Sequence, residues 1–454
     1  MAEDVDVLVV GGGLAGITAA LELQRLGRRV LLVEQSPRLG GKAGSTYTSL
    51  GEFPTGPTSF NGRVPSFWRL FELLGLEADE VVRLHPSSSA RYVVRGGKLR
   101  GLKPNPLSVL FTGALTFREK WALVREFLFA RTARLDPADE SLHALLVRRF
   151  GESVVEHFFA AVMTGIFAGD LRKLSAQTCM PALATAEKEY GSVLKGALAS
   201  LKKKEPGAQP GLYTFKSGFG VLGERAAKKV PCLLGTPLES LVIGRHGVSA
   251  TAGSTRIEAR AVVLATEADV ASRLLASSLP LAAGTLARFD YAPMTLVQWA
   301  ERTSGESKLP EGFGYLSAPV EQLFSLGALF VGDLRGESPR RFSSFVGGAL
   351  QPQRAALPEA ELVAGVSGDL QRLTGGSLGE VVNVVRWPRA VFQPAVGHAS
   401  QLQTLEATLE GFPVALAGSY LGGAAMKDAI GSGFSAAARV ASWPLVDAPL
   451  RSAS

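Results

Sequence analysis

The chain has 454 residues, 46% of them hydrophobic, and 48 Lys and Arg against 41 Asp and Glu give a net charge of +7. This composition excludes a largely disordered chain. The length is sufficient for two or three domains. No compact basic tract interleaved with aromatic residues occurs, so nucleic acid is not an expected partner, whereas an anionic substrate or a membrane surface is compatible with the charge.

Cysteines, the start of the chain and the hydrophobic runs bound its surroundings. The two cysteines, Cys179 and Cys232, form neither a zinc motif nor a disulfide framework, which favours a reducing compartment. The acidic start leads directly into an apolar strand, so we expect no signal peptide, and no run of about 18 uncharged apolar residues predicts a transmembrane helix. We expect a cytoplasmic protein, with peripheral attachment to the inner face of the cell membrane left open.

Residues 6–44 predict a strand–turn–helix–strand unit that binds a dinucleotide. An apolar run, Val5–Val10, leads into a Gly-x-Gly-x-x-Gly motif and a helical pattern, and a second run, Val30–Val33, ends at Glu34. This spacing suits a carboxylate that accepts the ribose hydroxyls of an adenine dinucleotide from the tip of the second strand. The phosphates are expected at the helix N-terminus, where free N–H groups and the helix dipole favour an anion.

Each glycine of the motif has its own expected task. Gly11 permits the tight turn, Gly13 lets the backbone approach a pyrophosphate, and Gly16 lets the helix pack closely on the strand. A glycine-rich turn alone is weak evidence, but the two strands, the helix and the acid together favour a cofactor site over an ordinary turn.

The string E-Q-S-P-R-L-G-G-K from Glu34 to Lys42 resembles the flavin-containing amine oxidase superfamily, in which E-x-x-x-R-x-G-G-R/K continues the FAD-binding fold. The resemblance implies FAD rather than NAD, and it implies that Arg38 and the Gly40-Gly41 backbone approach the diphosphate or the flavin. The cofactor-binding residues predicted in this first stretch are Gly11, Gly13, Leu14, Ala15, Gly16, Glu34, Gln35, Arg38, Gly40, Gly41 and Lys42.

Residues 45–62 are predicted to form a loop, because they are rich in proline and glycine. The string from Gly56 to Phe60 resembles the G-P-x-S-F stretch of the protoporphyrinogen oxidase family, which runs beside the flavin. Gly56, Pro57, Thr58 and Ser59 are therefore predicted to bind the cofactor. That family usually has an acid and an amide just before Gly-Pro, where this chain has Pro54-Thr55.

A short helix is predicted over 64–76, followed by two strands joined at Arg95-Gly-Gly97. The first of these strands matches the family string R-Y/F-x-x-x-G-x-L at Arg91. The resemblance implies that Arg91 faces the substrate and pairs with a propionate carboxylate. The alternative is a solvated arginine at the end of a strand.

Residues 104–200 show helical patterns, in which Phe117, Trp121, Val124 and Leu128 form one apolar stripe. The stripe predicts either a buried core face, which is the commoner case, or contact with a membrane surface. The related oxidases place a membrane-associated helical domain in this part of the chain. A polar, turn-rich linker is expected at 202–211.

The string Met163–Asp170 resembles the family's T-G-I-Y/F-A-G-D and places Gly165 at the substrate. Asp170 is expected to cap the next helix or to hold an arginine, and capping is preferred over a catalytic role. Further on, a buried strand ending at Thr266 returns the chain to the cofactor fold. A mostly β region over 290–400 follows, and its apolar strings resemble the family's substrate wall.

Three apolar residues of that wall, Leu316, Leu329 and Phe345, match positions that line the macrocycle site, with simple core packing as the alternative. The string that begins at Arg386-Trp387 leads back to the flavin in the family, and Trp387 is predicted to bind the cofactor. The last helix is expected to aim backbone N–H groups at the flavin's pyrimidine oxygen. The cofactor residues predicted from position 266 onward are Thr266, Trp387, Gly418, Ala424, Ala425 and Met426.

The last motif departs from the family, because the usual Asn-Asp-Cys is Lys427-Asp428-Ala429 here. The lysine is a reason to consider altered flavin potential or substrate fit. Without a cysteine in this segment, a thioether link to the flavin is not expected.

The predicted fold class is α/β, with a Rossmann-like FAD-binding domain, a mixed β-sheet substrate domain and a helical insertion. The FAD-binding domain is assigned to 1–63, 210–280 and 401–454, the substrate domain to 64–103 and 281–400, and the insertion to 104–205. The resemblance implies oxidation of protoporphyrinogen IX to protoporphyrin IX with oxygen as acceptor. No metal and no catalytic side chain are assigned, because hydride transfer to flavin N5 asks for positioning rather than acid–base groups.

Rival functions stay open. Coproporphyrinogen, which carries more carboxylates, is the nearest alternative substrate, and extra arginines near the slot would favour it. An amine oxidase, a carotenoid desaturase and a flavin-binding paralogue without turnover are further alternatives. A homodimer is left open as well.

Overall fold

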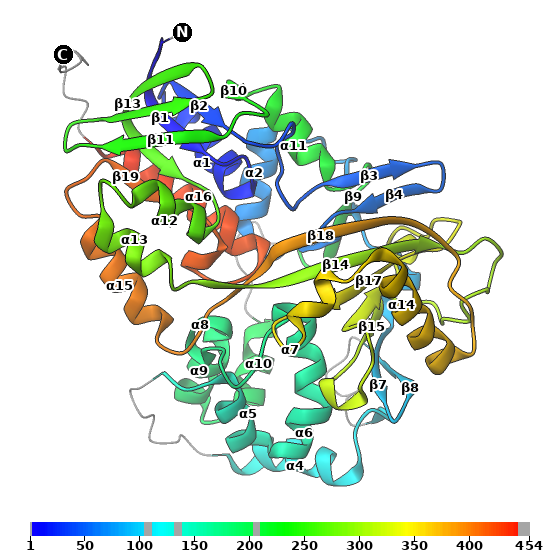
Figure 1. The fold of residues 1–454 in the computed structure, drawn as a ribbon. Coiled ribbons are helices and arrows are strands. Elements are labelled where there is room, and N and C mark those ends of the chain that lie inside the picture. The colour runs from blue at the N-terminus through cyan, green and yellow to red at the C-terminus, as the bar shows by residue number, and fades with distance from the viewer. Residues whose placement is uncertain (1, 104–110, 131–138, 203–208, 444–454) are drawn as a thin grey trace.

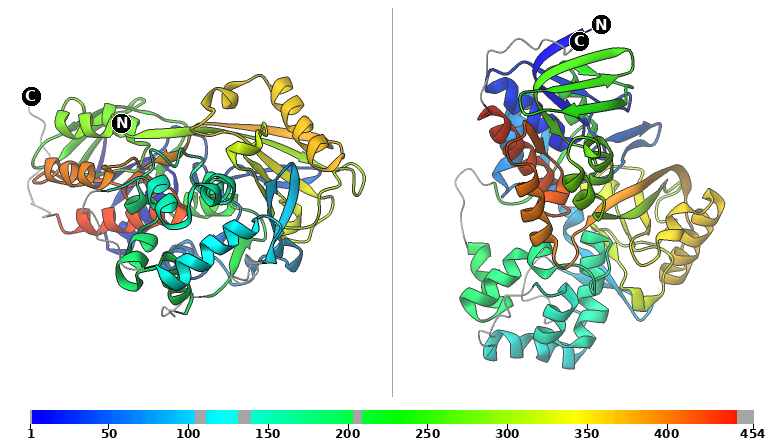
Figure 2. Two further views of the ribbon diagram at one scale, coloured as in Figure 1. Left: turned by 90° about the horizontal axis from the view of Figure 1, so that it is seen from below. Right: turned by 60° about the vertical axis from the view of Figure 1, so that its left-hand side comes forward.

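The computed structural model describes residues 2–103, 111–130, 139–202 and 209–443. Figure 1 shows three regions: a sheet with helices on both sides at the top, a second sheet to the right, and a group of helices below. The right-hand view of Figure 2 also shows the lower helices apart from the two sheets. The mixed sheets with flanking helices confirm the predicted α/β class.

The first sheet has the strand order β10-β2-β1-β13-β12-β11, and β19 pairs with β13. The central strands β1, β2, β13 and β19 run parallel. The second halves of β1 (Val7–Val10) and β13 (Ala261–Leu264) are continuously apolar and buried, as expected where a sheet is covered on both faces. The strand bounds are β1 (Ala2–Val10), β2 (Val30–Val33), β10 (Cys232–Leu233), β11 (Leu238–Ile243), β12 (Val248–Ala252), β13 (Thr255–Leu264) and β19 (Val414–Leu416).

Helices cover both faces of this sheet. On one face α1 (Leu14–Arg25) and α16 (Met426–Ala441) cross closely, because Gly433 has no side chain to hold the α1 backbone away. Helix α11 (Gly220–Ala227) joins the same apolar cluster. The other face carries α12 (Ala268–Leu275), α13 (Pro280–Leu286) and α15 (His398–Thr408).

Helix α2 (Pro65–Leu74) falls in the range predicted for the substrate domain, yet it packs elsewhere. Its buried residues Phe67, Leu70 and Phe71 belong to the cluster that covers the first sheet. The aromatic spacing forms a helix face that fits this cluster, and no local signal in the sequence shows which domain such a face will join.

The second sheet has the order β18-β14-β17-β16-β15-β7-β8. Its two longest strands, β14 and β18, pair antiparallel, and α14 (Glu359–Thr374) packs on one side through Leu362, Val366 and Leu370. The strand bounds are β7 (Arg91–Arg95), β8 (Lys98–Leu102), β14 (Asp290–Ala300), β15 (Gly314–Leu316), β16 (Gly327–Leu329), β17 (Arg341–Gly347) and β18 (Glu380–Gln393).

The prediction of a loop over 45–62 is confirmed for residues 55–59 and was wrong for most of the rest. The segment forms the hairpin β3 (Ser45–Thr48) and β4 (Gly51–Pro54), whose turn needs Gly51 at a φ of +114°, and then the short strand β5 (Phe60–Asn61). β5 lies in a small sheet with β6 (Val81–Arg83) and β9 (Leu212–Phe215). The partner strand β9 is remote in sequence, so no local pattern shows this pairing.

The lower helices share an apolar cluster of their own. They are α4 (Phe117–Phe129), α5 (Leu142–Phe150), α6 (Glu152–Val154), a π-helical turn (Val155–Phe159), α7 (Ala160–Phe167), α8 (Ala176–Cys179), α9 (Pro181–Tyr190) and α10 (Val193–Lys202). Of the helices in the described ranges, none is both long and apolar enough to cross a bilayer. Most of the predicted polar linker lies outside the described residues.

Asp170 does not cap a helix, contrary to the prediction. Its carboxylate accepts a hydrogen bond from the Arg172 amide at 2.9 Å, which stabilises a turn, while Ser175 caps α8. Ser175 is the cap because it stands immediately before the helix, where its hydroxyl accepts a hydrogen bond from the Thr178 amide.

The apolar stripe of α4 points outward. The side chains of Phe117, Trp121 and Leu128 are 83%, 55% and 53% exposed, whereas Glu119 and Glu126 on the opposite side are buried. The core interpretation of the stripe was therefore wrong, and the inward face carries two acidic residues beside Leu123.

Candidate functional site

A cavity of about 1270 Å³ lies between the first sheet, the second sheet and helix α7. One end is formed by the loops after β1, β2 and β13 and by the start of α16, which meet at the carboxyl edge of the parallel strands. The other end is formed by β7, β15, β16, β17 and α7. Crevices at this edge of a parallel sheet are the usual ligand sites of such folds.

The glycine motif forms a cradle at the first end. Gly11 has a φ of +102°, and a Cβ there would lie 2.6 Å from the Ala265 carbonyl oxygen, so the turn requires glycine. Gly16 lies against the Gly11 carbonyl and lets α1 pack on the strand. A Cβ on Gly13 would meet no atom within 4 Å, which means that this position faces the open cavity.

Glu34 stands beside the cradle at the end of β2. Its carboxylate accepts hydrogen bonds from the amides of Gly12 at 2.6 Å and Ser36 at 2.7 Å. These bonds hold the acid at the cavity wall, where the sequence predicted a ribose contact. Arg38 donates to the Leu39 and Gly41 carbonyls and so fixes the turn that carries Gly40 and Gly41.

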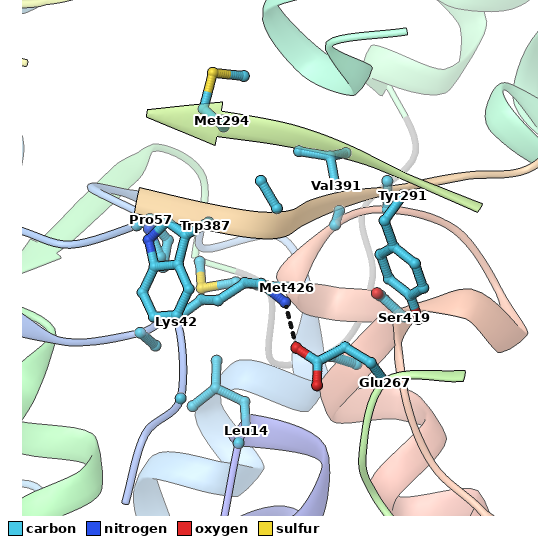
Figure 3. A pocket seen from close by; sticks show the side chains of 18 of the residues that line it. Leu14, Lys42, Pro57, Glu267, Tyr291, Met294, Trp387, Val391, Ser419 and Met426 are labelled. Atoms are coloured by element: carbon cyan, nitrogen blue, oxygen red, sulfur yellow. Dashed lines mark hydrogen bonds and ion pairs between the residues drawn. The ribbon is translucent and has the colours of Figure 1, made fainter. Parts of the chain in front are cut away.

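Lys42, Pro57, Trp387 and Met426 converge from four separate segments in the middle of the cavity (Figure 3). The Lys42 ammonium lies 3.0 Å from a carboxylate oxygen of Glu267 and 6.0 Å from the centre of the Trp387 ring. The Trp387 indole donates to the Thr55 carbonyl at 2.7 Å, which fixes the ring against the cavity wall.

The two departures from the family pattern lie outside the cavity lining. Pro54 and Thr55 are buried, and their carbonyls accept hydrogen bonds from Gln298 and Trp387. Lys427 is 53% exposed and stands 3.6 Å from Asp428. Asp428 accepts a hydrogen bond from the Ala425 amide and so shapes the start of α16, next to the lining residues Ala424 and Ala425.

The second end of the cavity is apolar around a single cation. Leu316 and Leu329 come from neighbouring strands, Phe345 from β17, and Gly165 from α7. Gly165 lies so close to the Leu316 side chain that a larger residue would displace it. Within the described part of the chain, Arg91 is the one charged side chain that lines this end.

Arg91 has no carboxylate partner within 4 Å among the described residues. Its guanidinium lies 4.9 Å from the centre of the Phe313 ring and contacts the Ser89 carbonyl at 3.5 Å. Burial lowers the pKa of Arg91 from its ordinary value, because desolvation disfavours the charged form. An arginine keeps its charge in proteins, so this cation is available to an anionic ligand group.

The cavity gathers the five substrate residues predicted from the sequence and most of the predicted cofactor residues. Three predicted cofactor residues do not line it. Gly16 is covered by the Gly11 backbone, and Thr58 is buried behind the wall, where its carbonyl accepts from Thr214. Ser59, the neighbour of Thr58 in the chain, is the third.

Several lining residues were not predicted, among them Glu267, Tyr291, Phe313 and Tyr420. Burial raises the pKa of Tyr291 and of Tyr420, so both phenols stay neutral. Glu267 directly follows Thr266, and its place after a parallel strand was the available signal. Tyr291 and Phe313 belong to strands or loops whose inward faces depend on distant pairings.

The donor set at the first end fits a flavin dinucleotide. The open position at Gly13, the helix N-terminus of α1 and the carboxylate of Glu34 suit a diphosphate and a ribose, while Trp387, Pro57 and Met426 give flat or flexible apolar surfaces for a ring system. The apolar end adjoins this donor set in the same cavity.

Comparisons with known proteins agree with this geometry. A family described as flavin containing amine oxidoreductase matches residues 14–441. The chain is 28% identical to a coproporphyrinogen III oxidase of Propionibacterium freudenreichii, over 93% of this chain and 88% of the relative. It is also 28% identical to the human protoporphyrinogen oxidase, over 96% of this chain and 98% of the relative.

Solved structures share the fold. A protein from Exiguobacterium sp. 255-15, provisionally named a protoporphyrinogen oxidase, superposes with a TM-score of 0.82 at 22% identity, over 97% of this chain and 98% of that one. Cyclohexylamine oxidase from Brevibacterium oxydans gives a TM-score of 0.69 at 20% identity, over 96% and 99%.

Proposed function

Because the chain belongs to the flavin containing amine oxidoreductase family and is an FAD-dependent oxidoreductase, we propose that it oxidises a porphyrinogen. The specific substrate that we propose is protoporphyrinogen IX, converted to protoporphyrin IX with molecular oxygen as the final acceptor. The proposal is supported by relatives named for the oxidation of protoporphyrinogen and coproporphyrinogen, which match nearly the whole chain.

One observation carries the choice of substrate. The second end of the cavity is apolar and, in the described ranges, has Arg91 as its single charged lining residue. Each buried carboxylate of a ligand needs a cation or hydrogen-bond donors to offset its desolvation. A slot with one arginine therefore favours the porphyrinogen with fewer carboxylates, and coproporphyrinogen would leave more of them without a partner.

The residues of the chain have a positioning task in this reaction. FAD, when bound, supplies the acceptor of the hydride. Leu316, Leu329 and Phe345 offer an apolar wall for a flat macrocycle and exclude water, Gly165 keeps the slot thin, and Arg91 fixes one edge through a propionate. Since no proton-transfer side chain is required for such binding, orientation is the main contribution of this end of the cavity.

The decisive experiment supplies the FAD-loaded protein with protoporphyrinogen and coproporphyrinogen in parallel, in air, and follows porphyrin fluorescence against a control without enzyme. We expect faster growth with protoporphyrinogen. Faster growth with coproporphyrinogen would overturn the choice of substrate, and no growth above the control would favour an amine or carotenoid substrate, or a paralogue without turnover.

Arg91→Ala is expected to raise KM for protoporphyrinogen about tenfold and to change kcat little, because a charge-assisted contact at the substrate edge contributes about 1.5 kcal/mol to binding. Arg91→Lys keeps the positive charge but loses the planar guanidinium, so its KM should lie between those of the unaltered protein and Arg91→Ala. Steady-state kinetics of the three proteins check this. Unchanged kinetics in Arg91→Ala would remove Arg91 from the site.

We also propose that α4 attaches the protein peripherally to a membrane. Its exposed aromatic residues Phe117 and Trp121 stand beside the exposed cations Arg118 and Arg125, an arrangement suited to the interface of an anionic bilayer. Sedimentation with vesicles tests the proposal: binding should be strong with anionic lipid and weak with neutral lipid. Equal recovery in the supernatant with both would contradict it.

A further inference from the structure

The ion pair between Lys42 and Glu267 has no role in the reaction described above, although it lies inside the cofactor end of the cavity (Figure 3). Its two charged atoms are 3.0 Å apart, and the side chains are 33% and 34% exposed. Neither residue makes another ion pair within 4 Å in the part of the chain that the structure describes. Each charge is therefore balanced chiefly by the other.

Both members of the pair are attached to the phosphate cradle. Lys42 directly follows Gly41, and a Cβ on Gly41 would lie 3.1 Å from the Gly13 Cα; the Gly40 amide also donates to the Gly12 carbonyl at 2.8 Å. On the other side, Glu267 is two residues after Ala265, whose carbonyl lies against Gly11. The pair thus joins the two walls that flank the cradle.

A diphosphate in this cradle would bring two negative charges close to the pair. The Lys42 ammonium would attract these charges and the Glu267 carboxylate would repel them. In a partly buried site both interactions are stronger than they would be in water. Every donor that Lys42 directs at Glu267 is one that it does not direct at a phosphate. The Trp387 ring, 6.0 Å away, gives the released ammonium a second attractive surface within the cavity.

We propose that Glu267 competes with the diphosphate of FAD for Lys42, so that this ion pair limits the affinity of the protein for its cofactor. Lys42 is the cofactor-binding cation, and Glu267 is a positioning residue that acts through it. The pair keeps the lysine charge balanced when the cradle holds no anion and gives it up when a dinucleotide binds.

The test is titration of the FAD-free full-length protein with FAD, followed by the change in flavin fluorescence. Glu267→Gln is expected to bind FAD about three- to tenfold more tightly than the unaltered protein, and Lys42→Met about three- to tenfold more weakly, the range expected for one partly exposed charge pair. If Glu267→Gln binds FAD with equal affinity, the competition is wrong. If it binds FAD more weakly, the competition is wrong and the pair is a clasp that retains the cofactor.

Glu258→Gln is the matched control. Glu258 lies on β13, the strand that precedes Glu267, and pairs with Arg256 at 2.8 Å, but it does not line the cavity. Its FAD affinity should equal that of the unaltered protein, and a gain as large as that of Glu267→Gln would overturn the proposal in favour of a general charge effect. The titration uses no porphyrinogen, so its outcome is separate from that of the proposed reaction.

Discussion

Helices α1 and α4 differ in the side chains that they bury: α1 is buried on all sides from Leu14 to Leu23 and is mostly apolar, whereas α4 buries two acids. Helix α1 places Ile17, Leu21 and Leu23 against the first sheet, as its apolar pattern predicts. Helix α4 buries Glu119 and Glu126 beside Leu123. It leaves Phe117, Trp121 and Phe129 exposed. An apolar helix face is therefore not always the buried one: the polar face is buried instead when the folded protein supplies hydrogen-bond and ion-pair partners for it.

The partners of the α4 acids explain the reversal. Glu119 accepts hydrogen bonds from Arg95 at 3.0 Å and Ser153 at 2.6 Å, and Glu126 accepts from the Ser192 hydroxyl and the Val193 amide at the start of α10. Buried carboxylates are stable when they are paired and hydrogen-bonded in this way. Most of these donors lie far from α4 in the sequence, so the pattern of α4 alone cannot show them.

The largest expected effect concerns the region that follows its pattern. Gly13→Val should lose retention of FAD, with affinity reduced more than about tenfold, because the new side chain enters the open cradle, where a Cβ has no protein atom within 4 Å. The ratio of flavin to protein absorbance after purification measures this. Normal FAD content would contradict the dinucleotide site.

Gly284→Val serves as its control. Gly284 lies on α13 away from the cavity, is exposed, and likewise has open space where a Cβ would stand. Circular dichroism of both variants should match that of the unaltered protein, and only Gly13→Val should lose the flavin.

The next effect concerns the inverted helix. Glu119→Gln should destabilise the helical region by about 3 kcal/mol, because removing one member of a buried ion pair leaves the largely buried Arg95 without its counter-charge. Denaturant unfolding, or hydrogen exchange of α4, measures this loss. The exposed Glu189→Gln should change the free energy of unfolding by no more than about 0.5 kcal/mol, and an equal loss in both variants would refute the importance of the pairing.

The same carboxylate predicts a pH dependence. Burial alone would raise the pKa of Glu119, but hydrogen bonds from Ser153 and Thr116 and the charge of Arg95 overcome it and lower this pKa below the ordinary 4.5. Its contribution to stability is therefore complete above about pH 4.5 and is lost as the pH falls through the lowered pKa. The stability difference between the unaltered protein and Glu119→Gln should shrink over that range, and a constant difference would contradict the assignment.

The smallest effect on the folded state is expected from the outward face. Phe117→Ser with Trp121→Ser should leave the free energy of unfolding within about 1 kcal/mol, since both side chains are mostly exposed, while binding to anionic vesicles falls several-fold. A large loss of stability would mean that these residues pack inward after all. Undiminished binding to vesicles would show that the exposed face of α4 is not the membrane-binding surface.

Local patterns predicted the parts of the molecule whose partners are close in sequence. The unit from Val5 to Glu34, the two strands around Gly96-Gly97 and the final helix were recognisable from periodicity and turn residues, and the residues placed in the cavity by resemblance mostly line it. The same reasoning failed at β5, whose partner β9 is remote, and at α4, whose buried face carries two acids. Glu267 was missed because a single acid after a strand carries no periodic signal.

The pairing of β1 with β13 has a consequence for synthesis of the chain. Val7 of β1, the strand that supports the phosphate cradle, lies opposite Ala261 of β13. This partner strand is synthesised roughly 250 residues later, which takes roughly ten to fifty seconds at the usual rate of translation. Helix α16, the last contributor to the cofactor cavity, is made later still. A chain halted on the ribosome before β13 has left the exit tunnel should therefore be unable to bind FAD. Cofactor binding is thus expected to be one of the last steps in the synthesis and folding of this protein.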